Sequence, residues 1–163
     1  MHRSPHPAAS TAIGLAIAVD DDSGYRLDDR VWRGFGVFRE ADGGRSTTFD
    51  PIIATGTPLP HNGHVEVVRQ YRARHTHGEY RFTEYSRLDA DGMPHGELAP
   101  WTRVLFPFTD EDATDDELSR RPAVRTDSGP LVEERYRVDP AGLVDVTISN
   151  LDSGFRRQLR LGR

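Results

Sequence analysis

The feature that most constrains the fold is a regular alternation of residue types near the C-terminus, over residues 131–161. A period of two places alternate side chains on opposite faces of an extended strand. Two turn sequences, Asp139–Gly142 (DPAG) and Asp152–Gly154 (DSG), divide the run, since proline presets φ and glycine can adopt a positive φ. The pattern predicts a three-stranded meander with one mostly buried face. Glu134 and Arg157 fall on that face, so we expect them to be solvated or paired.

Five further segments are rich in β-branched and aromatic residues and are bounded by turn signals, which predicts short strands. The second of them contains Pro51, which has no N–H, so we expect this strand at a sheet edge or with a bulge. Seven or eight short strands with polar turns favour an all-β fold, an antiparallel β-sandwich. The five segments are residues 31–38, 46–60, 64–73, 78–88 and 102–108.

Two short helices are expected beside the strands. Residues 10–19 are small and apolar almost all round, and Ser10 or Thr11 can cap their start. The spacing of Thr114 and Glu117 matches a capping box, which predicts one or two helical turns before Arg121.

Length and composition favour one β-domain in a reducing compartment. A chain of 163 residues suits one domain. We expect it over residues 31–163, after a disordered start, the short helix and an acidic linker in residues 1–30. The sequence has no cysteine, so it forms neither disulfides nor thiolate metal sites, which fits a cytoplasmic location.

The same data exclude several partners and chemistries. No apolar run of 18 residues is present, so we expect no membrane span, and a net charge of −5 argues against a general nucleic-acid binder. There is no cysteine nucleophile, no Gly-x-Ser-x-Gly elbow and no recognisable carboxylate pair, so we expect no catalytic residue and no enzyme. His75 and His77 have two-ligand spacing, but we interpret them as loop histidines and expect no metal site.

Four segments in the same order resemble the 70-kDa heat-shock chaperones of the DnaK family. The C-terminal meander, FGVF at residues 35–38 and FDPIIATGTPLP at residues 49–60 are similar to parts of the family's peptide-binding β-domain. ASTAIGLAIA at residues 9–18 is similar to the last helix of its ATPase domain. The resemblance covers residues 9–161, with a poor match over 89–130. In the meander the matching residues are Asp139, Gly142, Leu143, Val146, Ser153 and Gly154.

The resemblance implies a sandwich of two four-stranded antiparallel sheets that clamps an extended apolar peptide between loops. The loops 39–45 and 74–78 align with the two that form the family's cleft. Tyr80 and Phe82 align with residues of its central pocket, which two aromatic rings would fill, and the alternative is that both belong to the sandwich core. The peptide-binding residues that the resemblance implies are Phe35, Val37, Glu40, Ala41, His75, Tyr80 and Phe82.

Three hypotheses about function follow. The first is a non-enzymatic, chaperone-type domain that binds unfolded or extended peptide segments. It needs no cofactor, and ATP, an ATPase domain and co-chaperones enter only if an ATPase domain lies upstream. The second is a protein–protein docking module on the same sandwich, with its cleft closed by aromatic residues. The third is a metal- or sugar-dependent hydrolase on a sandwich scaffold.

Overall fold

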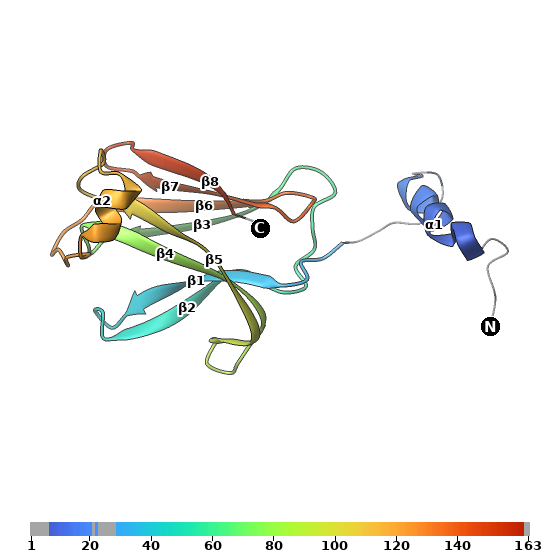
Figure 1. The fold of residues 1–163 in the computed structure, drawn as a ribbon, viewed down its shortest axis with the longest axis horizontal. Coiled ribbons are helices and arrows are strands. Elements are labelled where there is room, and N and C mark those ends of the chain that lie inside the picture. The colour runs from blue at the N-terminus through green and yellow to red at the C-terminus, as the bar shows by residue number, and fades with distance from the viewer. Residues whose placement is uncertain (1–6, 21, 23–28, 162–163) are drawn as a thin grey trace.

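In the computed structural model, two four-stranded antiparallel sheets pack face to face, and one helix lies apart from them (Figure 1). The structure describes residues 7–20, 22 and 29–161. One sheet has the strand order β2-β1-β4-β5 and the other β3-β6-β7-β8, so the expected antiparallel β-sandwich is confirmed. The strands are β1 Gly34–Ala41, β2 Ser46–Ile53, β3 Val65–Arg72, β4 His77–Leu88, β5 Pro94–Pro107, β6 Leu131–Val138, β7 Val144–Asn150 and β8 Arg156–Leu161.

The C-terminal meander has the predicted form. Strand β6 pairs with β7 and β7 with β8, and residues on these strands are alternately buried and more exposed. The two residues that interrupt the buried face are both paired, as expected. Glu134 accepts hydrogen bonds from Arg39, and Arg157 donates to the carbonyl oxygens of Leu105 and Ala113. The meander therefore buries an apolar face and neutralises the charges that fall on it.

Strand β2 shows both of the features that Pro51 predicts as alternatives. It is an edge strand of its sheet, and its pairing with β1 shifts register between Phe35 and Gly36. Phe35 lies opposite Ile53 and Gly36 opposite Pro51, so the intervening Ile52 forms a bulge. A proline without an N–H is tolerated here because the edge leaves one side of the strand unpaired.

Strand β5 is longer than the expected segment 102–108, because it begins at Pro94. In the turn before it, the N–H of Gly92 donates to the carbonyl of Asp89, and the Asp89 carboxylate accepts hydrogen bonds from the N–H groups of Asp91 and Met93. The first expected strand, in contrast, begins later, at Gly34, and runs to Ala41. The turn that follows it is therefore shorter than residues 39–45.

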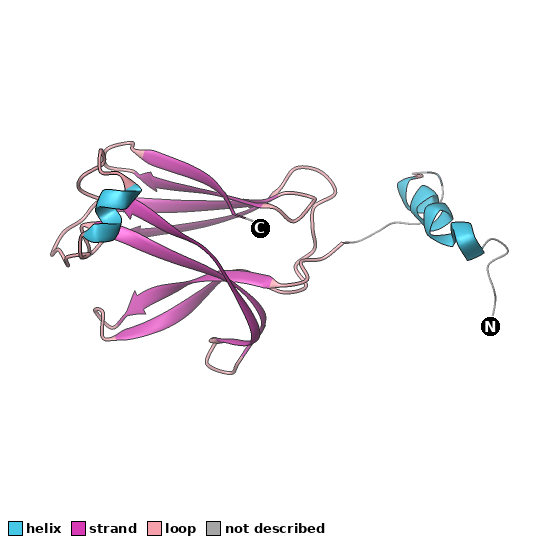
Figure 2. Cartoon of the chain, in the orientation of Figure 1, coloured by secondary structure: helices cyan, strands magenta, loops and turns pink. Residues whose placement is uncertain are grey.

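Both helices form, with one difference at the first (Figure 2). Helix α1 spans Ser10–Val19, but its N-cap is Ala9 and no side chain caps it, so the prediction of a Ser10 or Thr11 cap was wrong. Helix α2 spans Asp115–Arg120 and begins with the predicted capping box of Thr114 and Glu117. A single-turn 3-10 helix, η1 Pro7–Ala9, precedes α1.

Neither helix has the length and apolar character needed to cross a bilayer, within the residues that the structure describes. Helix α2 packs Leu118 against Leu105 of β5 and Ala113. The expected disordered start and most of the acidic linker, residues 1–6, 21 and 23–28, lie outside the described residues.

A glycine fixes how an aromatic cluster packs on the β2-β1-β4-β5 sheet. The ring of Phe49 is buried and makes edge contacts with Phe38 and Tyr85 at centroid distances of 5.0 and 5.4 Å. A Cβ atom at Gly36 would lie 2.5 Å from Cζ of Phe49 and 2.6 Å from the carbonyl oxygen of Asp50. Because backbone as well as ring is in the way, no side chain fits at residue 36 without movement of the strand pair.

We therefore expect Gly36→Ala to lower the free energy of unfolding by about 1–3 kcal/mol, the usual cost of overpacking. Gly14→Ala is the matched control, because a Cβ atom there has no heavy atom within 4 Å. Urea denaturation followed by tryptophan fluorescence measures both variants. Equal stability of Gly36→Ala and the wild type would contradict the packing described here.

Candidate functional site

The predicted site residues fall into two groups, four in the interior of the sandwich and three at its rim. Phe35 and Val37 on β1 and Tyr80 and Phe82 on β4 are each at most 4% exposed. Glu40, Ala41 and His75 instead lie at the rim, where the β1–β2 turn and the β3–β4 connection meet (Figure 1).

The four buried residues fill the space between the sheets. Phe82 packs against Phe35 at a centroid distance of 5.4 Å and against Tyr136 of the opposite sheet at 6.1 Å. Tyr80 stacks on Phe82 at 6.0 Å. All four side chains, Tyr80 and Phe82 included, therefore lie in the core of the sandwich, which is the alternative given above to a peptide-binding pocket. In this conformation they offer a ligand no accessible surface.

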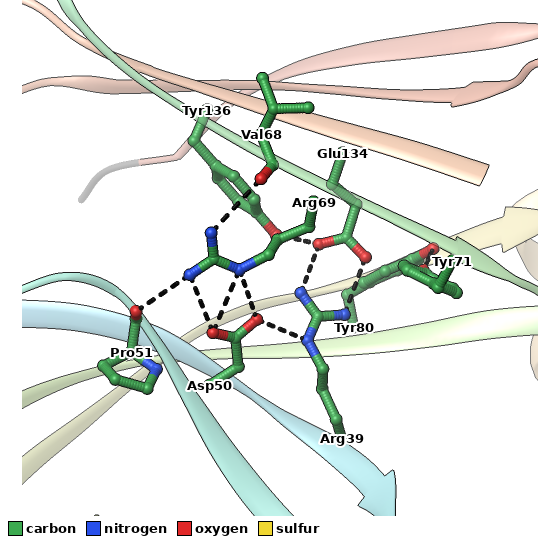
Figure 3. Close-up of polar contacts among 9 residues, drawn as sticks. All are labelled: Arg39, Asp50, Pro51, Val68, Arg69, Tyr71, Tyr80, Glu134 and Tyr136. Atoms are coloured by element: carbon green, nitrogen blue, oxygen red, sulfur yellow. Dashed lines mark hydrogen bonds and ion pairs between the residues drawn. The ribbon is translucent and has the colours of Figure 1, made fainter.

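Beside these aromatic rings, four charged residues form an alternating chain that crosses from one sheet to the other (Figure 3). Arg69 of β3 donates to Asp50 of β2 with an Nε–Oδ2 distance of 3.1 Å. Asp50 also accepts from Nε of Arg39 on β1 at 2.8 Å. Arg39 in turn donates hydrogen bonds from both terminal nitrogens to the carboxylate of Glu134 on β6, at 2.9 and 2.7 Å. Two ion pairs therefore join the sheets, and a third lies within one sheet.

Tyrosines surround this charge chain (Figure 3). The hydroxyl of Tyr136 donates a hydrogen bond to the carboxylate of Glu134, a residue that is 0% exposed. The guanidinium of Arg39 lies 5.5 Å from the ring centroid of Tyr71, and the hydroxyls of Tyr71 and Tyr80 share a hydrogen bond of 2.7 Å. The buried carboxylate thus has three donors from two residues, which satisfies it in a place that excludes water.

The contacts within the charge chain favour the charged forms of Asp50 and Arg39, and burial beside Glu134 favours the neutral forms of the tyrosines. Burial alone would raise the pKa of Asp50, but hydrogen bonds from Arg69 and Arg39 outweigh it and hold the pKa below its ordinary 3.8. Burial would lower the pKa of Arg39, but the hydrogen bond and charge of Glu134 keep it above its ordinary value. Burial, followed by the charge of Glu134, raises the pKa of Tyr136 and Tyr80. Asp50 and Arg39 therefore stay ionised at neutral pH, and Tyr136 and Tyr80 stay neutral, as a structural bridge requires.

At the rim, the structure brings two predicted residues together. Nε2 of His75 lies 3.4 Å from Oε1 of Glu40, so the pair spans the gap between the β3–β4 connection and the end of β1. Ala41 is the last residue of β1, and its carbonyl accepts from the N–H of Gly44 to close the turn. Arg125, from the segment between α2 and β6, donates to the carbonyl of Gly43.

Sequence reasoning found part of this arrangement. It flagged Glu134, because an acid interrupts an apolar face, but it assigned Arg39 to a loop. The contact of Arg125 with Gly43 could not be predicted, because Arg125 lies in a segment whose sequence has no regular pattern. Within the described ranges no three His, Cys, Asp or Glu side chains are grouped so that they could hold a metal ion.

Comparisons with known proteins give no family: no protein-family model matches the chain, and neither does any curated protein. The fold and its charge chain therefore define the class of protein, an antiparallel β-sandwich whose two sheets are joined by two ion pairs, one of them to the buried Glu134.

The buried bridge leads to a stability prediction. We expect Glu134→Ala to lower the free energy of unfolding by about 3–5 kcal/mol, because it leaves the two terminal nitrogens of Arg39 without the buried carboxylate that accepts from them. The double variant Arg39→Met, Glu134→Leu should recover most of that loss, since apolar residues of similar volume often replace a buried pair at little cost. Urea denaturation measures the free energy of unfolding of both variants and of the wild type.

The control for that experiment is Glu66→Ala, which removes an acid that pairs with Arg135 and Arg137 on the open face of β3 and β6. Exposed pairs contribute little, so its denaturation midpoint should stay close to that of the wild type. A Glu134→Ala variant as stable as Glu66→Ala would show that the sheets do not depend on the bridge.

His77, the first residue of β4, leads to a pH prediction. Burial, followed by the charges of Arg103, His75 and Arg121, lowers its pKa below the ordinary 6.5 despite the opposing effect of Glu79. As the pH falls through about 6.5, the unfolded chain takes up a proton that the folded chain resists, so stability falls. We expect the free energy of unfolding to decrease from pH 7 to pH 5, and this slope to be smaller in His77→Gln. Denaturation midpoints across that range test it, and equal slopes would contradict it.

Proposed function

We propose that this chain is a non-enzymatic polypeptide-binding domain of the chaperone type, related to the peptide-binding β-domain of the 70-kDa heat-shock proteins. The main observation in support is the rim at one end of the two four-stranded antiparallel sheets, where residues 42–45 and 73–76 come together. The ion pair of Glu40 with His75 joins the two segments there. Two loops facing each other across a sandwich mouth can hold an extended segment through main-chain hydrogen bonds.

The proposed ligand is an unfolded or extended segment of another protein. Because Tyr80 and Phe82 occupy the interior, the ligand lies on the rim and does not insert a side chain deeply between the sheets. No cofactor takes part, and an ATPase domain or co-chaperones would act from outside this chain. A cytoplasmic location belongs to the same proposal, since a cysteine-free sequence suits a reducing compartment.

Titration of fluorescein-labelled, extended apolar peptides, followed by anisotropy, tests the proposal. We expect saturable binding in the micromolar range, with the peptides competing for one site. Ala41→Trp places a bulky ring at the mouth and should weaken binding at least about tenfold, a loss of about 1.4 kcal/mol. Ala90→Trp, in the β4–β5 turn at the other end of the sandwich, is the matched control and should bind as the wild type does.

Absence of saturable binding to any peptide would contradict the proposal. Equal binding by Ala41→Trp and Ala90→Trp would show that the rim is not the site.

The second candidate is a protein–protein docking module with a closed cleft, and the buried positions of Phe35, Val37, Tyr80 and Phe82 favour it. In that case Phe82→Ala should cost about 3–5 kcal/mol of stability, as a core deletion does. Both candidates predict that loss, because Phe82 belongs to the core in each, so the peptide titration separates them: a docking module with a closed cleft would bind no extended peptide saturably.

A further inference from the structure

The segment between α2 and β6 lies along the β3–β4 connection as an added strand would. We call residues 123–130 the strap. Residues 75 and 125 form an isolated antiparallel bridge, so the strap runs opposite to the connection. Three main-chain hydrogen bonds join the two: from Ala73 N to Pro130 O at 2.9 Å, from Thr126 N to Arg74 O at 2.8 Å, and from Thr76 N to Val124 O at 2.9 Å.

The side chain of Arg125 carries this contact across the mouth of the sandwich. Its guanidinium donates to the carbonyl of Gly43 in the β1–β2 turn. Nη1 of Arg125 and Oε2 of Glu40 both lie against Gly44, at 2.8 and 3.3 Å from the position that a Cβ atom would take. Glu40 also faces His75 on the other side of the mouth. One arginine of the strap therefore sits between the two loops, next to an acid.

We propose that residues 73–76, facing the 42–45 turn, form a strand-addition site for an extended peptide, and that the strap occupies this site as an internal ligand. The inference rests on the proposed peptide-binding function and names the class of peptide. In the strap, Val124-Arg125-Thr126 meets the site, so the external ligand is an extended segment with an arginine between β-branched residues. The arginine reaches the Gly43 carbonyl beside Glu40, a place where an acidic side chain would be repelled.

The strap is held in a way that permits its release. Its residues 123–125 are exposed, Val124 by 54%, so little apolar area holds it down. Main-chain hydrogen bonds contribute only about 0.5–1.5 kcal/mol each after exchange with water. In addition, Oγ1 of Thr126 is buried and has no hydrogen-bond partner, which costs stability while the strap is in place. A segment with few buried contacts opens at low free energy.

One end of the strap stays in place when the rest opens. A Cβ atom at Gly129 would lie 2.4 Å from the carbonyl oxygen of Ala73, so the backbones are in direct contact there. The N–H of Leu131, the first residue of β6, is held by the carboxylate of Asp152. Opening therefore pivots on residues 129–131, and it frees the N–H of Thr76 and the carbonyl of Arg74 for an incoming strand.

The experiment measures binding of a labelled peptide with the sequence of residues 121–128, RPAVRTDS, to the full chain. The double variant Arg125→Ala, Thr126→Pro removes the arginine and the donor N–H of the strap. We expect it to bind the peptide at least about tenfold more tightly than the wild type, because the competing internal ligand is lost. Arg120→Ala on α2 is the matched control, since Arg120 pairs with Asp116 on the exposed surface of that helix, and it should bind as the wild type does.

Two further measurements sharpen the result. A peptide with glutamate in place of its central arginine should bind the double variant at least about tenfold more weakly. Amide hydrogen exchange at Thr76 should become faster in the double variant, which reports release of the strap directly. If the proline variant fails to fold, Arg125→Ala alone is measured against Arg120→Ala.

The outcomes separate this inference from the proposed function. Saturable binding of apolar peptides to the wild type, with no gain in the strap variants, overturns the strap inference and leaves peptide binding standing. Equal binding of the arginine and glutamate peptides overturns the assigned ligand class. Absence of binding to every variant overturns both the inference and the function on which it rests.

Discussion

The structure depends on a chain of alternating charges that joins the two sheets near one end. A carboxylate as deeply buried as that of Glu134 is tolerated only with donors around it, because removing an ion from water costs several kcal/mol. Arg39 supplies two of those donors from the opposite sheet, and Asp50 and Arg69 extend the chain to the edge strands. Sheet spacing and strand register are therefore coupled, since a slip of one residue would turn either partner to solvent.

The same chain explains why the interior beside it is closed. Tyr71 and Tyr136 contact these charges directly, and the hydroxyl of Tyr80 shares a hydrogen bond with that of Tyr71. Phe82 then packs among the rings. Polar hydroxyls face the carboxylate and ring faces meet the apolar core, so one layer satisfies both environments. The groups that a ligand could reach therefore lie at the rim, where main-chain groups of two loops and a few charged side chains are near the solvent.

Local patterns predicted the fold well wherever a segment carried its own signal. The meander was visible because its alternation and its two turns agree, and α2 because Thr114 and Glu117 form a capping box. Pro51 predicted an edge position or a bulge, and the structure has both. Strand β5 begins earlier than the pattern predicts, because its first residues include Pro94 and Gly96, which interrupt a strand pattern, although Pro94 pairs with Leu88 of the long partner β4. The 39–45 loop was drawn too long because charged residues such as Arg39 rarely point into a core.

The sequence by itself determined the class of fold, the meander, the edge position of β2 and the absence of thiol chemistry, because each follows from period, turn residues or composition within a short window. Tertiary structure alone decided which charges meet. Arg39 and Glu134 are 95 residues apart, and Arg125 and Gly43 are 82 apart. No local pattern relates such residues. Only when two sheets fold face to face does the cost of burying an unpaired charge select one partner from many.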